Sequence, residues 1–155
     1  PGVKKSAGIG PANDLAERVL VPCKPSSLWL INSWDVDEGK ESYDFCMTKV
    51  ALGHNPEACV VNCGPDRAAR LFPHGYFDYV IVLADCFGLG EFSAIAETYW
   101  RLVRKGGILG IAYAVKGTEQ FTAFKEMHEV RGFSDFDCEA LVINGNLSFS
   151  GIKVR

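Results

Sequence analysis

The stretch from Tyr76 to Tyr113 limits the possible folds of this chain more than any other part of it. Phe77 to Leu83 is an apolar run, too short for a membrane span and typical of a strand buried on both faces of a parallel sheet. Apolar residues then recur at helical spacing as far as Lys105-Gly106-Gly107, which predicts a helix with a glycine cap. Ile108 to Ala114 predicts a second strand. Strand, helix and strand of this length form one right-handed βαβ unit, which indicates an α/β fold.

The composition is typical of one soluble globular domain spanning residues 1–155. At 155 residues the chain can bury one core, and 48% hydrophobic against 23% charged residues is ordinary for such a domain. The net charge of -3 argues against a nucleic-acid binder, which would carry a basic face. No apolar run approaches the roughly 20 residues of a spanning helix, and no signal peptide is visible. We therefore expect a cytoplasmic protein with no membrane partner; its start at Pro1, without a methionine, leaves room for residues upstream.

The cysteines and the clustered basic residues both favour structural roles. Six cysteines without metal-finger spacing predict buried thiols in a reducing compartment: Cys23, Cys46, Cys59, Cys63, Cys86 and Cys138. Arg101, Arg104 and Lys105 are expected in the last turn of the helix, where cations complement the helix dipole.

A glycine-rich segment near the start of the chain is a candidate ligand-binding turn. Val3 to Ser6 is predicted as the end of a first strand, and Ala7-Gly8-Ile9-Gly10-Pro11 as a turn before a helix from Ala12 to Leu20. A G-x-G turn between strand and helix presents backbone N–H groups to a nucleotide-like ligand. The same pattern also occurs in ordinary loops, but its place in the first βα turn favours binding.

Three further predicted strands have a polar residue at or after their carboxyl end, at the sheet edge where open α/β folds bind ligands. Asn32 ends the strand from Ser27 to Asn32, and it either stabilises a turn or contacts a cofactor. Asp66 follows the strand from Ala58 to Asn62, as a helix N-cap or as a contact. Asp85 follows Leu83, and it either caps the next helix or carries function.

The end of the chain predicts a helix and a hairpin. Thr118 is expected to cap a helix from Glu119 to about Val130. Two strand-like segments, Cys138 to Ile143 and Leu147 to Val154, flank the turn signal Asn144-Gly145-Asn146. The expected fold is a Rossmann-like three-layer α/β sandwich, with a mostly parallel twisted sheet ending in an antiparallel hairpin.

The order FD, apolar strand, Asp, helix, W-x-L-V-R-K-G-G, apolar strand resembles the second half of class I S-adenosylmethionine-dependent methyltransferases. Within them the chain is most similar to the small-molecule O-methyltransferase branch, whose acidic turn corresponds to Ala84-Asp85-Cys86-Phe87. The resemblance extends over nearly the whole chain. It implies S-adenosylmethionine as cofactor and a small hydroxylated acceptor. The general-base candidates at the same sheet edge are Asp85 and, as the weaker of the two, Tyr113. The cofactor contacts that the resemblance implies are Ser6, Gly8, Gly10, Asn32, Asp66 and Asp85.

The sequence also departs from the family pattern. Ser6 stands at the first family glycine and Lys4 at the preceding acid, or in another register Ser6 takes the next glycine. Asn32 replaces the ribose-binding carboxylate, and Ala112 the second carboxylate of metal-dependent members. One carboxylate is a poor Mg²⁺ site, so we expect no metal.

Two hypotheses of different classes follow from the resemblance and these departures. The first is an active methyltransferase, and the second is a non-catalytic methyltransferase-like domain that serves in binding or assembly. An NAD-binding domain is disfavoured by the missing acid and the terminal hairpin. The expected partners exclude nucleic acid and membrane and allow for a homodimer.

Overall fold

The computed structural model of the chain describes residues 5–10, 25–33, 58–112, 118–131, 136–143 and 146–152. For residue 85 and for the segments after residue 127 it describes the backbone path alone. The helix expected at residues 12–20 lies outside the described residues, as does Tyr113.

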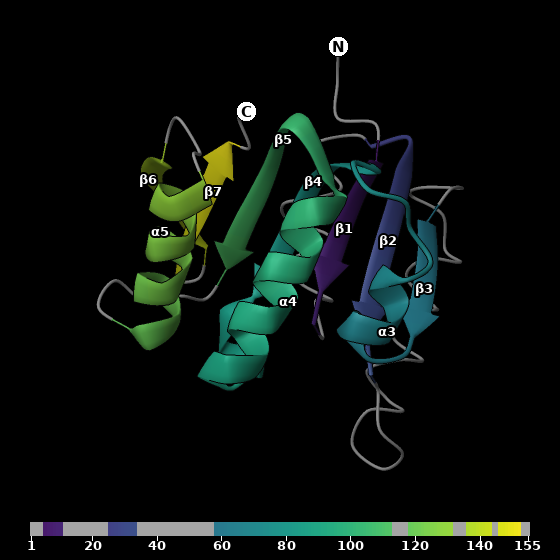
Figure 1. The fold of residues 1–155 in the computed structure, drawn as a ribbon, viewed down its shortest axis with the longest axis horizontal. Coiled ribbons are helices and arrows are strands. Elements are labelled where there is room, and N and C mark those ends of the chain that lie inside the picture. Colours follow the sequence, from purple (N-terminus) through teal and green to yellow (C-terminus); the bar gives the residue numbers. More distant parts are fainter. Residues whose placement is uncertain are drawn as a thin grey trace.

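Seven described strands form one sheet in the order β3-β2-β1-β4-β5-β7-β6 (Figure 1). Neighbours among β1 to β5 pair in parallel, whereas β7 pairs antiparallel with both β5 and β6. This is the Rossmann-like α/β architecture that the sequence predicts. The strands are β1 (Lys5–Ile9), β2 (Ser27–Asn32), β3 (Ala58–Asn62), β4 (Phe77–Leu83), β5 (Val103–Ala112), β6 (Phe136–Ile143) and β7 (Asn146–Ile152).

Three described helices lie on one face of the sheet (Figure 1). They are α3 (Pro65–Ala69), α4 (Leu89–Leu102) and α5 (Glu119–Arg131). The apolar stripe of α4 is buried as its helical spacing predicts, at Phe92, Ile95, Ala96, Tyr99 and Leu102. It packs against the side chains that alternate onto this face from the central strands, including Ala7, Ile9, Val80, Val82, Leu109 and Ile111. One continuous core therefore joins sheet and helices.

The Tyr99 hydroxyl ties α4 to the start of α3. It donates a buried hydrogen bond of 2.9 Å to the backbone carbonyl of Pro65. Burial raises the pKa of this phenol well above its ordinary value, and the nearby Cys63 and Asp66 raise it further. The neutral phenol is therefore the form that the folded chain stabilises.

The first strand and the βαβ unit differ in their boundaries from the sequence prediction. β1 extends from Lys5 to Ile9, so Gly8 lies in a strand and not in a turn. The helix α4 ends at Leu102, without reaching Lys105-Gly106-Gly107, because the chain turns at once into β5. Gly106 has φ +69°, and the pairing of β4 with β5 is irregular there. The two glycines thus serve a strand irregularity instead of a helix cap.

Arg104 and Lys105 consequently lie on β5 and not in the last helical turn, where only Arg101 remains. Arg104 forms an ion pair with Asp78 of β4. The second oxygen of Asp78 accepts a hydrogen bond of 2.8 Å from the backbone N–H of Lys5. One carboxylate therefore links the starts of β1, β4 and β5.

The N-cap of α3 is Gly64, so Asp66 lies in the first helical turn and does not cap it. Pro65 starts this helix because its missing N–H costs nothing at the first position. At α5 the prediction is confirmed, since the Thr118 hydroxyl accepts a hydrogen bond of 3.3 Å from the N–H of Phe121.

The cysteines whose side chains the structure describes do not follow the expectation of buried thiols. Cys59 and Cys86 are exposed, and Cys63 is half-buried. The outward position of Cys59 follows from its place on β3, an end strand of the described sheet. None of the helices in the described part of the chain is long and apolar enough to cross a membrane.

Candidate functional site

The carboxyl ends of the parallel strands form one row, at the lower edge of the sheet in Figure 1. Asn32 of β2 pairs in register with Asn62 of β3. Gly10 follows directly after β1, where its N–H donates a hydrogen bond of 2.9 Å to the carbonyl of Ile31. Leu83 of β4 pairs with Ala112 of β5. Residues from five strands therefore meet at the edge where open α/β folds bind their ligands.

Gly10 needs to be glycine for two reasons. Its φ of +117° is a conformation that other residues rarely adopt. An added Cβ would also lie 2.9 Å from Cδ1 of Leu83 on the neighbouring strand. The chain can therefore leave β1 beside Asn32 and Leu83 only because this residue has no side chain. The position of Gly10 directly after the first strand agrees with the sequence prediction.

Ser6 and Gly8 lie further inside the sheet. Ser6 pairs with Leu28 on one side and Tyr79 on the other, and it is fully buried. It precedes Gly10 by four residues, which is roughly 13 Å along a strand. The implied contact from Ser6 therefore does not lie at the carboxyl edge, because the strand extends beyond the residue expected to end it. Within the described residues its hydroxyl oxygen has no hydrogen-bond partner.

Asn32 is the last residue of β2 and is half-buried at the edge. Its amide can both donate and accept hydrogen bonds, as the two hydroxyls of a ribose require. Its register neighbour Asn62 is an exposed second amide at this edge. The sequence pattern singled out only Asn32, although Asn62 likewise ends an apolar strand.

Asp85 lies in the short 3-10 helix η3 (Ala84–Cys86), two residues beyond the end of β4. Its backbone therefore reaches the carboxyl edge as predicted. The alternative role as cap of the next helix is wrong, because the N-cap of α4 is Gly88. The following turn is linked to α5, since the Gln120 amide donates a hydrogen bond of 3.5 Å to the carbonyl of Phe87.

Asp66 follows β3 at the same edge and is exposed in the first turn of α3. Of the two roles that the sequence allowed, capping is excluded by Gly64. The described residues contain no group of three or more metal-ligating side chains. The chemistry at this edge therefore depends on amides, backbone groups and two carboxylates.

Comparison with known proteins gives a clear result for the fold. No family model matches the chain, and no curated protein matches its sequence. Among solved structures, spermidine synthase from Thermotoga maritima aligns over 98% of this chain with a TM-score of 0.68 and 14% identity. The N-methyltransferase NodS from Bradyrhizobium japonicum WM9 aligns over 99% with a TM-score of 0.67 and 13% identity. The S-adenosylmethionine-dependent methyltransferase SibL aligns over 99% with a TM-score of 0.68 and 11% identity.

The chain thus has the fold of class I methyltransferases and spermidine synthases. It spans 54% of the spermidine synthase, 88% of NodS and 51% of SibL. At sequence identities of 11% to 14%, the structural similarity establishes the fold alone.

Proposed function

We propose that this chain is an S-adenosylmethionine-dependent methyltransferase acting on a small hydroxylated acceptor. The observation that carries the proposal is the meeting of Gly10, Asn32 and the Asp85 backbone at the carboxyl edge of a methyltransferase-fold sheet. This edge is the binding position of α/β folds in general.

The residues at this edge have the chemical groups that contacts with the cofactor require. Gly10 allows backbone to approach a ligand closely, and Asn32 supplies an amide to ribose hydroxyls. Gly64 and Asp66, which begin the next turn along the edge, would lie on the adenine side. An amide lacks the charge of a carboxylate, and its hydrogen bonds are about half as strong. The bound cofactor would supply an electrophilic methyl group.

The chain's own contribution is to position the acceptor and to take its proton. In-line displacement depends on orientation, which a rigid sheet edge provides. Asp85 would accept the proton of the acceptor hydroxyl as general base. The connection from Gln120 to Phe87 holds the turn that carries Asp85. These roles assign catalysis to Asp85 and binding to Gly10, Asn32 and Asp66.

One observation favours the second hypothesis, a non-catalytic domain. In the described part of the chain, the carboxyl ends of β1, β2 and β5 carry Gly10, Asn32 and Ala112, and none of these is a carboxylate. Such an edge would bind the cofactor weakly and leave the sheet as a scaffold for binding or assembly.

Calorimetric titration with S-adenosylmethionine and S-adenosylhomocysteine tests the proposal. A micromolar Kd, about -8 kcal/mol, is expected for a working site. The Asp85→Asn variant should keep this affinity and lose methyl transfer, because the general base acts after binding. Absence of binding at millimolar ligand in a folded sample would overturn the enzyme and support the scaffold. Equal transfer rates with and without Asp85 would refute its catalytic role.

A further inference from the structure

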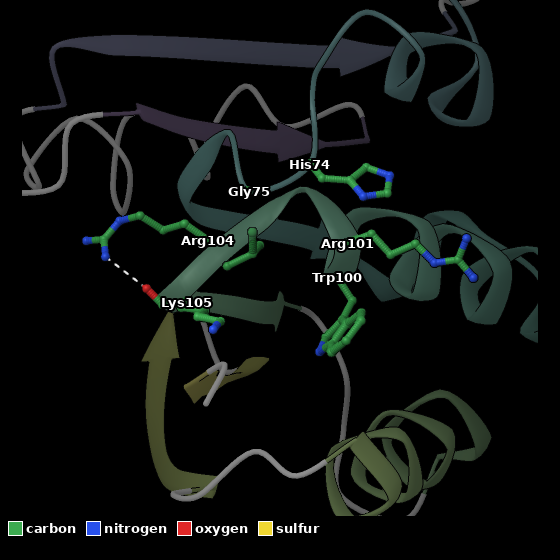
Figure 2. Close-up of a pocket in the computed structure, with 7 residues that line it drawn as sticks. His74, Gly75, Trp100, Arg101, Arg104 and Lys105 are labelled. Carbon is green, nitrogen blue, oxygen red and sulfur yellow. Dashed lines mark hydrogen bonds between the residues drawn. The ribbon is translucent and has the colours of Figure 1, made fainter. Parts of the chain in front are cut away.

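The opposite edge of the sheet carries a second candidate site, independent of the proposed methyl transfer. A hollow of about 530 Å³ lies at the starts of β4 and β5, beside the end of α4. The residues lining it include His74, Trp100, Arg101, Arg104 and Lys105 (Figure 2). β4 has seven residues, so this hollow is roughly 20 Å from the carboxyl edge.

The lining of this hollow is basic in an acidic protein. Three of its residues are arginine or lysine, and none is aspartate or glutamate. The whole chain has a net charge of -3, so this concentration of cations is local. The cations meet here because α4 ends at Leu102 and β5 starts at Val103, which turns Arg104 and Lys105 out of the helix.

The cations differ in their availability. Arg104 is held by Asp78, and its Nη1 donates a hydrogen bond of 3.0 Å to the Lys105 carbonyl, directed away from Arg101 (Figure 2). Among the described residues, the Arg101 side chain forms a helical ion pair of 3.6 Å with Glu97, and the two side chains are 55% and 45% exposed. Exposed pairs of this kind contribute little and exchange readily. Arg101 and the exposed Lys105 are therefore the cations available to a ligand.

The remaining lining provides room and an aromatic surface. Gly75 has φ +69°, and its backbone N–H donates a hydrogen bond of 3.1 Å to the carbonyl of Arg101. This bond fixes the loop beside the hollow, and because the residue is glycine, no side chain at this position fills the hollow. Trp100 is half-buried, and in Figure 2 its indole extends to the side of the hollow on which Lys105 lies, whereas the Arg101 guanidinium extends away from both. Small-molecule sites combine such an aromatic surface with a few polar groups in a hollow of this size.

We propose that this hollow binds a phosphorylated small molecule. On binding, Arg101 leaves its exposed pair with Glu97 and turns toward Lys105, and both contact the phosphate, since a guanidinium fork and an ammonium suit its oxygens. Trp100 contacts the organic part of the ligand. An open hollow of this volume in a chain of net negative charge fits a small molecule better than a nucleic acid, which would need a larger basic face.

Calorimetric titration with phenyl phosphate tests this site. We expect the unaltered protein to bind phenyl phosphate more tightly than inorganic phosphate, because only the former reaches Trp100. The double variant Arg101→Gln/Lys105→Gln should weaken phenyl phosphate binding at least tenfold. Its S-adenosylmethionine titration should match that of the unaltered protein, which separates this site from the carboxyl edge.

A matched control removes two exposed cations that do not line the hollow, Arg67 and Lys125. The variant Arg67→Gln/Lys125→Gln makes the same charge change, so it should leave phenyl phosphate binding within twofold. Equal weakening in both double variants would show a general charge effect and overturn the site. No binding to the unaltered protein at millimolar phenyl phosphate would overturn it too. Equal affinity for the two phosphates would refute the contact with Trp100.

Discussion

The two edges of the sheet differ in how they use charge. At the amino edge Asp78 joins three strands through Arg104 and the Lys5 backbone, and further cations line a hollow. At the carboxyl edge the described strand tips carry glycine, amides and small residues, with Asp66 and the Asp85 backbone just beyond them. The amino edge therefore uses its carboxylate for structure, whereas the polar residues of the carboxyl edge lie where open α/β folds bind ligands.

This difference separates stability from function along one sheet. Substitutions at the amino edge should lower the free energy of unfolding. The molecules that remain folded should bind the cofactor with unchanged affinity. Substitutions at the carboxyl edge should change cofactor affinity more than their effect on stability explains. The predictions below test this separation, beginning with the largest expected effect.

Gly107→Ala should be the most destabilising substitution, lowering the free energy of unfolding by about 3 kcal/mol. The added methyl group would press against backbone atoms, which cannot move aside as a flexible side chain can. A Cβ there would lie 2.7 Å from Val103 Cγ1 and 2.8 Å from the Asp78 carbonyl oxygen. Urea unfolding measures the loss. Gly90→Ala is the control, because a Cβ at that helical position meets nothing within 4 Å. A loss for Gly107→Ala no larger than that of this control would contradict the tight contact between β4 and β5.

Gly10→Ala should cost about 2 kcal/mol, from backbone strain and the contact with Leu83. It should also weaken S-adenosylmethionine binding at least tenfold, because the turn beside Asn32 must shift. Gly75→Ala is the matched substitution at the other edge, where φ is also positive but the nearest atom is 3.7 Å away. It should cost about 1 kcal/mol and leave cofactor affinity unchanged. Identical binding effects at Gly10 and Gly75 would remove the distinction between the edges.

Asp78→Ala should destabilise the chain by about 2 kcal/mol, since it removes a charged acceptor from the Lys5 N–H and from Arg104. Chemical denaturation is the measurement, and calorimetry should show the same Kd for S-adenosylmethionine as before. A lower affinity in a fully folded sample would mean that the amino edge also supports the cofactor site.

Tyr99→Phe should cost about 1 kcal/mol at pH 8, because the Pro65 carbonyl loses its donor. Burial raises the folded-state pKa of Tyr99, so this stabilisation is complete below the unfolded value of about 10 and is lost as pH rises above it. The difference between the two proteins should therefore shrink by about 1 kcal/mol per pH unit above 10. Unfolding free energies at pH 8 and pH 11 check this, and a constant difference would refute the raised pKa.

Asn32→Asp should have the smallest effect on stability and a gain in binding. A carboxylate would strengthen hydrogen bonds to ribose hydroxyls by about 1 kcal/mol, roughly fivefold in Kd. S-adenosylhomocysteine titration measures it, and Asn62→Asp on the neighbouring strand is the control for added charge. The same gain from both variants would indicate a general effect of charge at this edge.

The fold could be predicted largely because its strands are short, apolar and separated by turn residues. The bounds of β2, β3 and β4 agree with the prediction, as does the buried stripe of α4. Local patterns failed where tertiary pairing decided the outcome. Lys105-Gly106-Gly107 has the composition of a helix cap, yet Val103 pairs with Phe77, so β5 starts five residues before the predicted start of the strand at Ile108.

The candidate site was predictable in part. Asn32 and Asp85 follow apolar strands, and the rule that parallel strands end at one edge brings them together. Ser6 could not be placed, because a glycine that continues a strand looks in sequence like a glycine that ends one. The basic hollow could not be predicted either. Its lining residues include Arg101, Arg104 and Lys105 together with His74, and only the fold brings His74 beside them.

The strand order also affects how the chain can fold during synthesis. β1 lies between β2 and β4, and its second neighbour β4 ends at Leu83, so it is complete only when about half of the 155 residues have been made. β7 lies between β5 and β6, so β6 has no place in the sheet until β7 has left the ribosome. Until then β5 exposes one unpaired edge to the cell, and unpaired edges invite aggregation. A chain that stalls or is cleaved before Asn146 would therefore be a natural target for chaperones and proteases.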